Sequence, residues 1–461
     1  ANDRKAALHA RLHATWGLGV LADRDSSKAA AALAKLAVAD TGEVELLAQA
    51  TKLLGDHQIA RSTDLLISRL AHPSKRVRYF AAQSLGKLER PEAAPALLQA
   101  ARENADEDPY LSHAIVMGLV GAKNHDVLAE AVTDESKAAR FATLLAYRRL
   151  GDVAVARFLQ DSDKEIVFEA ARAINDAPIE DAYPALAAAI DSPFANDPIL
   201  SIRALNAQFR LGGEDNARLL ASYAANDSNP EKFRLEAITQ LQSWPDPLQR
   251  DRVMGVYQPL PKRDAQVAIE AFKANAPGFL ASDSIAVQLK FLEAVSLLEA
   301  GGLEEELYAF VSNESAAGAA RAAAFSLLYK LDDPRMDELV NTASQSNASE
   351  LRLATLPIVS ERSPEQAKAI LILMVEGSVE EQRVAYETLA GSKQAFASEL
   401  LVKSLERLAA GEVPHAAQLE LIEAASQHPS ENVQTAFHRY QATISEASDP
   451  TAAYAFALEG G

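Results

Sequence analysis

One short sequence phrase recurs along the chain at a nearly constant interval. It has a polar turn of Asp, Asn or Ser, then an arginine beside an apolar residue, then an Ala-rich stretch that ends in leucine. The arginine position is held by Arg78, Arg140, Arg203, Arg234, Arg321, Arg352 and Arg383. Their separations of 62, 63, 31, 87, 31 and 31 residues are close to whole multiples of about 31. Such a period predicts an array of units that each pack on their neighbours.

The copy between His72 and Ala101 shows what one unit contains. An apolar stripe at helical spacing comes first, formed by Val77, Ala81, Leu85 and Leu88. Pro91 then suits the first turn of a new helix, whose stripe is Ala94, Leu97, Leu98 and Ala101. Two antiparallel helices per unit predict an all-α protein, a HEAT-like α-solenoid built from helical hairpins of about 31 residues.

The recurring arginines are interpreted as structural. An arginine near the start of each first helix can reach the Asp of an adjacent turn and so tie one repeat to the next. A ligand-binding residue would seldom recur evenly along a whole solenoid. By the same reasoning the turn residues Asp134, Asp163, Asp197 and Asp227 are predicted to be helix caps and not metal ligands.

Closely spaced prolines interrupt the pattern in the middle of the chain. They occur within 244–247, 258–261 and 276–278, so helices there should be short or their axis should bend. The predicted organisation has regular repeats over 1–243, an irregular Pro-rich hinge over 244–281, and C-terminal repeats over 282–461 that end in a linker.

Charge and composition exclude several kinds of function. The net charge of −19 repels phosphate backbones and anionic membrane surfaces, which argues against nucleic acid and favours a protein partner, basic if anything. With no cysteine, the chain cannot form a disulfide, a thiolate metal site or a covalent c-type haem linkage. No apolar run reaches the ~18 residues of a membrane-spanning helix.

The search for catalytic and cofactor-binding motifs yields one weak metal candidate. His9 and His13 lie four residues apart, so on a helix their rings share a face, but a third ligand is missing nearby. Gly17 and Gly19 nominally fit a dinucleotide-binding GxGxxA pattern inside an apparent helix, where close helix packing explains them better. The acidic stretches 104–108 and 304–306 are predicted to be an inter-repeat loop and a helix start.

No catalytic residue, cofactor-binding residue or cofactor is therefore predicted for this chain, and it is not expected to be an enzyme. Helical-repeat metalloenzymes of the deoxyhypusine hydroxylase type use His-Glu pairs, and none of the nine histidines is followed by Glu. A bilin lyase-like enzyme shares this style of repeat and is kept as a distant third alternative.

Several longer phrases are more specific than a generic helical repeat. They are 13–19 (HATWGLG), 77–88 (VRYFAAQSLGKL), 108–114 (DPYLSHA), 170–176 (AARAIND), 203–212 (RALNAQFRLG) and 244–252. Together they resemble the repeat segment of the large haem-binding dehydrogenase-like proteins of planctomycetes and verrucomicrobia. The resemblance implies a sugar-dehydrogenase-like propeller before the repeats and a CxxCH cytochrome domain after them, with haem c only in that flanking domain.

Two functions follow from these observations. The first is a spacer that sets the distance between a propeller and a haem domain in a periplasmic or otherwise extracytoplasmic oxidoreductase, its partners being flanking domains of the same polypeptide. The second is a free-standing module, cytoplasmic or not, that holds a separate protein partner.

Overall fold

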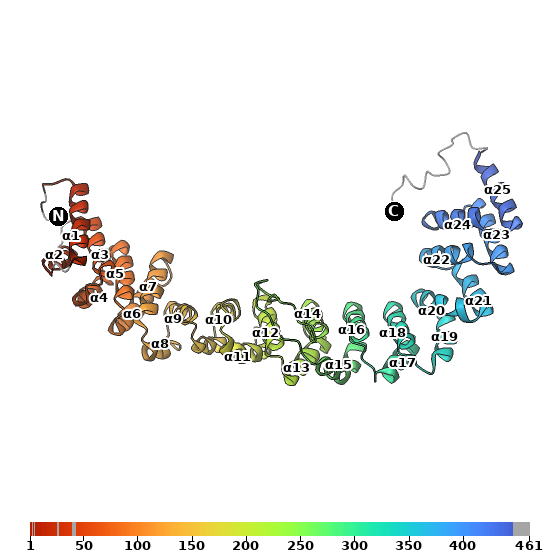
Figure 1. Cartoon of the computed structure of the whole chain (residues 1–461), viewed down its shortest axis with the longest axis horizontal. Coiled ribbons are helices and arrows are strands. Elements are labelled where there is room, and N and C mark those ends of the chain that lie inside the picture. The colour runs from red at the N-terminus through yellow and green to blue at the C-terminus, as the bar shows by residue number, and fades with distance from the viewer. Residues whose placement is uncertain (2, 4, 25–26, 39–42, 446–461) are drawn as a thin grey trace. The chain divides into compact units, whose positions relative to one another are not determined.

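The computed structural model describes residues 1, 3, 5–24, 27–38 and 43–445 (Figure 1). Across these residues the chain forms α-helices and short 3-10 turns, and the sole strand-like pairing is an isolated bridge between Arg250 and Tyr257. The predicted all-α solenoid of helical hairpins is confirmed.

The chain divides into two compact units. Unit 1 is Ala1–Leu220 with Asp246–Arg263, and unit 2 is Ala221–Pro245 with Asp264–Gly461. The loop 246–263 thus belongs to unit 1 although it follows a helix of unit 2. One helix, α13 (Glu214–Ala225), contains the boundary at residue 220.

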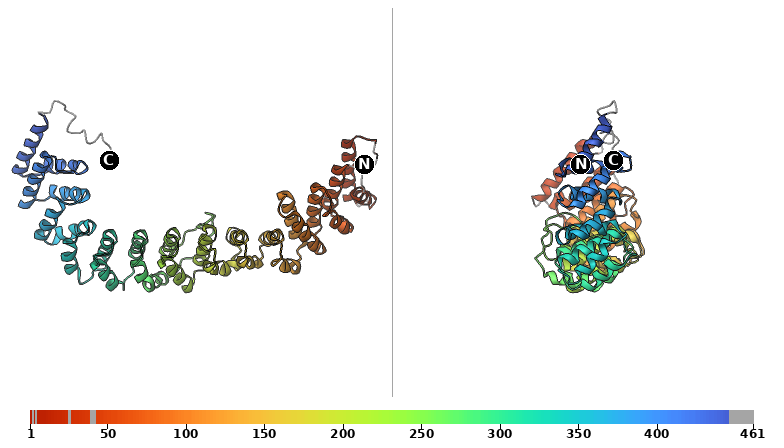
Figure 2. Two further views of the ribbon diagram at one scale, coloured as in Figure 1. Left: turned by 180° about the vertical axis from the view of Figure 1, so that it is seen from behind. Right: turned by 90° about the vertical axis from the view of Figure 1, so that its right-hand side faces the viewer.

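Unit 1 is built from two layers of helices (Figures 1 and 2). The first layer is α1 (Leu8–Asp23), α3 (Val44–Asp56), α5 (Lys75–Leu88), α7 (Pro109–Ala122), α9 (Lys137–Leu150), α10 (Lys164–Asp176) and α12 (Pro198–Leu211). The second layer is α2 (Ser27–Val38), α4 (Thr63–Arg69), α6 (Ala94–Asn104), α8 (His125–Ala131), the 3-10 helix η3 (Val153–Gln160) and α11 (Tyr183–Ala188). Successive first-layer helices pack side by side from α1 to α12.

Unit 2 repeats the same plan. Its first layer is α14 (Glu231–Gln242), α16 (Ile285–Leu297), α18 (Gly318–Lys330), α20 (Ser349–Arg362), α22 (Val379–Ala390) and α24 (His415–Gln427). Its second layer is α15 (Ala265–Leu280), α17 (Glu304–Ser312), α19 (Met336–Ser344), α21 (Pro364–Met374), α23 (Ala395–Ala409) and α25 (Glu431–Ser445).

The two helices predicted from the sequence over 72–101 both form. Both predicted stripes are buried in α5 and α6, and Pro91 starts the 3-10 turn that leads into α6. In space, however, α6 packs more closely on α7 than on α5. The closely packed hairpin therefore consists of a second-layer helix and the first-layer helix that follows it in the chain, such as α6 with α7. The sequence instead predicts a hairpin of α5 with α6.

Side-chain caps start many first-layer helices. Asp163 accepts from Glu165 N–H at the start of α10, and Asp197 accepts from Ile199 N–H at the start of α12, as predicted. The prediction that Asp134 and Asp227 cap helices is wrong, since the cap residues of α9 and α14 are Ser136 and Pro230. Asp134 and Asp227 instead bind arginine side chains, which replaces the cap role with an ionic one.

Glycines let α3, α5 and α7 approach closely. A Cβ atom on Gly55 would collide with Ser84 of α5, and one on Gly121 would collide with the backbone of Gly86. A Cβ atom on Gly86 would lie 2.6 Å from the Met117 carbonyl oxygen. Backbone contacts this close leave no room for a side chain, so these positions require glycine.

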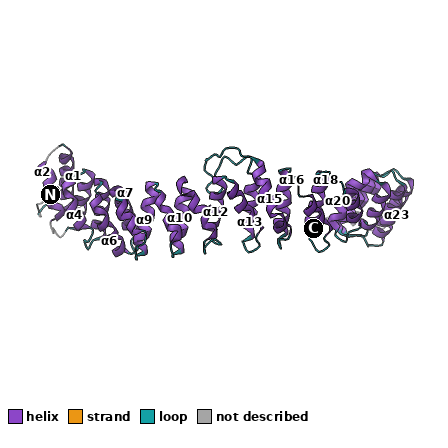
Figure 3. Cartoon of the chain, turned by 90° about the horizontal axis from the view of Figure 1, so that it is seen from below, coloured by secondary structure: helices purple, strands orange, loops and turns teal. Residues whose placement is uncertain are grey.

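The Pro-rich region differs in detail from expectation. After Trp244, which is fully buried, the described chain has no helix until Ala265, and then α15 continues for 16 residues with Pro277 in its last turn (Figure 3). Residues 245–264 thus contain no helix, and the helix α15 that follows them is not short. The division into 1–243, 244–281 and 282–461 remains a prediction.

Candidate functional site

Most of the predicted arginines occupy the same position in their helices, although their bonding partners differ. Arg78, Arg140, Arg234, Arg321 and Arg352 are each the fourth residue of their helix, here called the N4 position. Arg203 is the sixth residue of α12 and Arg383 the fifth residue of α22. Arginines that lie about 31 residues apart in the sequence therefore do not always lie at the same distance from the start of their helix.

Arg140 and Arg352 connect a turn to the next repeat. Arg140 donates through Nη1 to the Asp134 carbonyl oxygen at 2.8 Å and through Nε to Asp161 at 2.7 Å. Arg352 donates likewise to the Ser346 carbonyl and, at 2.7 Å, to Glu381 of α22. These bonds order the preceding turn and join neighbouring first-layer helices.

Arg234 and Arg321 bind the end of the preceding helix instead. Their Nε atoms donate to carbonyl oxygens ten residues earlier, those of Ala224 at 2.7 Å and Val311 at 2.8 Å. Arg234 also bonds to Ser282 Oγ at 2.8 Å. Both arginines are buried, and these bonds satisfy carbonyl oxygens that a helix end leaves unpaired.

The remaining predicted arginines have other surroundings. Arg203 holds both oxygens of Asp176 at 2.9 Å, and Arg383 binds Glu420 at 2.6 Å. The Nε of Arg78 is buried and has no hydrogen-bond partner within the described residues. All seven predicted positions therefore lie in first-layer helices, with four kinds of environment.

Sequence reasoning missed the other residues at N4. Gln288 Nε2 donates to the carbonyl oxygens of Leu280 and Ser282 at 3.0 Å, and Gln382 Nε2 donates to that of Gly377 at 3.0 Å. Gln418 and Ser201 bond in the same way to the turns before α24 and α12. A search for any side-chain donor four residues into a helix would have found them.

The weak metal candidates lie on α1. His9 and His13 are both exposed, and the His13 ring contacts Trp16 edge-on at 4.9 Å. Among the described residues no group of three His, Cys, Asp or Glu side chains is placed to hold a metal ion. Of the two nearby glycines, Gly19 packs against His57, as close packing predicts, whereas Gly17 faces open space.

A groove of about 840 Å³ runs along the exposed face of α9 in unit 1. Its floor is apolar and consists of Val116 of α7 with Phe141, Ala142 and Leu145 of α9. Glu165 and Ala177, at the two ends of α10, contribute to the lining. The close contacts through glycine stop at α7, because α9 contains no glycine.

Polar side chains surround this floor. Lys137 lies 2.9 Å from Asp163 and also bonds to Glu165. The hydrogen bond to Glu165 is the largest cause of the raised pKa of Lys137, and the bond to Asp163 is the second. The hydrogen bond from Lys137 lowers the Asp163 pKa in turn. At the other end Arg148 bonds to Glu169 at 2.6 Å, while Arg149 is exposed and has no ionic or hydrogen-bond partner within the described residues.

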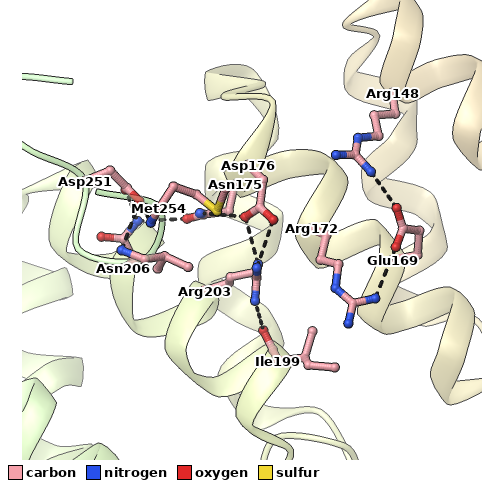
Figure 4. A network of polar contacts seen from close by, with 11 residues as sticks. Arg148, Glu169, Arg172, Asn175, Asp176, Ile199, Arg203, Asn206, Asp251 and Met254 are labelled. Atoms are coloured by element: carbon pink, nitrogen blue, oxygen red, sulfur yellow. Dashed lines mark hydrogen bonds and ion pairs between the residues drawn. The ribbon is translucent and has the colours of Figure 1, made fainter. Parts of the chain in front are cut away.

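Within unit 1, a polar network attaches the loop 246–263 to α10 and α12 (Figure 4). Asn206 Nδ2 donates to Asn175 at 2.8 Å and to the Asp251 carboxylate at 2.7 Å. The other carboxylate oxygen of Asp251 accepts from the backbone N–H groups of Val253 and Met254. Asp251 and Asn206 are both buried, so these bonds satisfy groups that water cannot reach.

Arg263 secures the far end of that loop. Its guanidinium donates to the carbonyl oxygens of Phe209 at 2.6 Å and Arg210 at 3.1 Å, at the end of α12. Burial is the main reason that the pKa of Arg263 is lowered, and the charge of Arg210 adds to it. The loop thus covers the end of α12 and leaves Leu248, Met254, Val256 and Tyr257 exposed.

These features define an α-solenoid with a groove along α9 of unit 1. The sequence model for HEAT repeats matches residues 36–108, and the architecture is HEAT-like. No curated protein matches the chain. Over the part that the structure describes, no helix is long and apolar enough to cross a membrane.

Several solved structures match the chain at low sequence identity. The complex of CpcE and CpcF of phycocyanin lyase from Nostoc sp. PCC7120 is 21% identical over 60% of this chain and 90% of that chain, with a TM-score of 0.26. Kap121p bound to RanGTP is 11% identical over 92% of this chain and 52% of that chain, with a TM-score of 0.42. This chain spans about half the length of Kap121p. Likeness at this level carries no argument about function.

Proposed function

We propose that this chain is a non-catalytic scaffold that holds a protein partner, and that the α9 groove is a place where the partner binds. The observation that carries the proposal is an apolar floor bordered by an exposed arginine, Arg149, without a partner in the described residues. Apolar area supplies binding free energy, and charged groups at the rim fix the orientation of the partner.

The hydroxyl group in the groove lining has a structural role. The only hydroxyl in its lining belongs to Ser112, at the N4 position of α7. Its Oγ donates to Asp106 at 3.0 Å and accepts from Asn104 at 2.9 Å. These bonds order the turn before α7, as the side chains at other N4 positions order the turns before their helices.

A finer form of the proposal concerns what is held. The phrases that resemble haem-binding dehydrogenase-like proteins support a spacer role, in which the partners are a propeller and a c-type cytochrome domain of one extracytoplasmic polypeptide. Haem c would then be bound by the flanking domain and not by this cysteine-free chain. The intact mass of the native polypeptide with a haem stain tests this form, and a native haem-free chain of 49.5 kDa would contradict it.

The scaffold proposal itself is tested by site-specific photocrosslinking in the source cells. A photoreactive phenylalanine replaces Phe141 on the groove floor or, as the control, Val153, an exposed apolar residue of the second layer. We expect one protein, or one flanking domain of the parent polypeptide, to be crosslinked from position 141 and not from 153. Equal crosslinking from both positions, or none from 141, would overturn the proposal.

A further inference from the structure

The two ends of the α9 groove carry opposite charge. At the N-terminal end of α9, three carboxylates face one ammonium group: Asp106 lines the groove, and Asp163 and Glu165 both contact Lys137. Even when the exposed Lys164 at the start of α10 is counted with Lys137, carboxylates exceed cations by one at this end. Lys137 is fully engaged by its neighbours, so the excess charge is available to a ligand.

The C-terminal end of α9 has the reverse balance. Arg148 and Arg172 share a single carboxylate, that of Glu169, at 2.6 and 3.2 Å (Figure 4). Arg149 beside them has no partner in the described residues. The nearby Asp176 does not compensate this charge, because both of its oxygens are held by Arg203. Cations therefore exceed carboxylates by two at this end.

The separation of the two ends decides how a ligand senses them. Lys137 and Arg149 are twelve residues apart on one helix, which corresponds to about 18 Å. Charges are screened over about 8–10 Å at ordinary ionic strength. Each end therefore acts locally, and the net charge of −19 on the whole chain contributes little inside the groove.

We infer that the segment held in the α9 groove is charge-polarised, with basic side chains at one end, apolar side chains in the middle and acidic side chains at the other end. This inference rests on the proposed function and names the partner that the groove fits. The acidic end of the segment lies at Arg148 and Arg149, and its basic end at Asp106 and Glu165. A segment of five or six extended residues, or about twelve helical residues, spans the floor.

A uniformly basic segment, which the overall charge of the chain favours at first sight, fits less well. It would place cations beside Arg148 and Arg149, where one carboxylate already serves two arginines. Like charges brought together in a partly buried groove cost binding free energy and lower specificity for that partner. A uniformly acidic segment meets the same difficulty at Asp106 and Glu165.

Three synthetic peptides with the same apolar centre test the inference on the full chain. The first carries Lys at one end and Glu at the other, the second carries Lys at both ends, and the third carries Glu at both ends. We expect the polarised peptide to bind at least about fivefold more tightly than either of the others, measured by fluorescence anisotropy. Equal affinity for all three would overturn the inference.

Charge reversal at one end gives the sharper readout. Arg149→Glu reduces the excess of cations at the C-terminal end of α9 from two to none, so the polarised peptide should lose its advantage over the peptide with Lys at both ends. Lys28→Glu, a reversal at an exposed residue of α2, is the matched control and should leave the order of the three peptides unchanged. Because Arg149 has no partner among the described residues, the variant is expected to fold, which circular dichroism checks.

The outcomes separate the inference from the proposed function. If the native partner crosslinks at position 141 but the three peptides bind equally, the scaffold stands and the charge-polarised segment is lost. If the polarised peptide keeps its full advantage over the peptide with Lys at both ends in Arg149→Glu, the assignment of the basic end is overturned. If nothing crosslinks at position 141 and no peptide binds, both proposals fail.

Discussion

The Arg140 Nε atom lies 2.7 Å from an oxygen of Asp161, in the turn that precedes α10. Both side chains are largely buried, at 14% and 6% exposure, and Arg140 also serves the carbonyl oxygens of Asp134 and Glu135. One guanidinium therefore connects two turns that lie on successive repeats.

Arg140→Leu should loosen the contact between α9 and α10. The substitution leaves Asp161 buried without its cation and two turn carbonyls without a donor, which should cost about 2–4 kcal/mol locally. Hydrogen exchange of the α9 and α10 amides measures this loss. Arg218→Leu, at an arginine that is 60% exposed, is the control and should cost less than about 1 kcal/mol.

Gly121→Ala should destabilise unit 1, because its new methyl group would meet the Gly86 backbone of α5. Backbone atoms cannot rotate away, so we expect a loss of about 1–3 kcal/mol in the free energy of unfolding. Gly17→Ala is the matched control, since nothing lies within 4 Å of its added Cβ atom in α1. That control should be neutral or stabilise the chain by up to about 1 kcal/mol, and equal effects of the two substitutions would refute the packing argument.

The loop 246–263 should detach when its buried anchor is removed. Asn206→Ala deletes the donor at 2.7 Å from Asp251 and leaves that carboxylate with fewer partners. We expect trypsin to cleave at Arg250 or Arg252 about tenfold faster, because cleavage follows the population of the opened loop. Asp246→Ala, at an exposed loop residue, should leave the cleavage rate nearly unchanged.

The ion pair between Arg102 and Asp134 should weaken in acid. The hydrogen bond from Arg102 is the main reason that the pKa of Asp134 lies below its ordinary value of 3.8. A lowered pKa in the folded state means that the pair contributes its full stability above about pH 4 and loses it as the pH falls further. In Arg102→Gln the Asp134 carboxyl should titrate at a higher pH by NMR, and an unchanged titration would show that Arg102 is not the cause.

The sequence predicts the helices of this fold well because their signals are local. The stripes of α5 and α6, the turn at Pro91 and the caps Asp163 and Asp197 all depend on residues within a few positions of one another. The sequence pattern identified the N4 position only where it is an arginine. Gln288, Gln382 and Ser201 also donate hydrogen bonds to the preceding turn, but their side chains are amides or hydroxyls and do not match an arginine pattern.

Contacts between distant residues could not be predicted in the same way. The bond from Asn206 to Asp251 joins positions 45 residues apart, and nothing local assigns the loop to α12. The α9 groove depends on where the glycine contacts stop, which is a property of neighbouring helices and not of α9 alone. Arg149 was unremarkable in the sequence for the same reason, and it became a candidate only when its neighbours were seen to pair among themselves.

The affinity of the crosslinked partner for the wild-type chain and for Phe141→Glu tests the central claim most directly. A carboxylate on the apolar floor should weaken binding by about tenfold or more, while Val153→Glu on the second layer should leave the dissociation constant unchanged. Melting curves confirm that both variants fold. A Phe141→Glu chain that is folded and binds the partner as tightly as the wild type would contradict the claim that the α9 groove holds the partner.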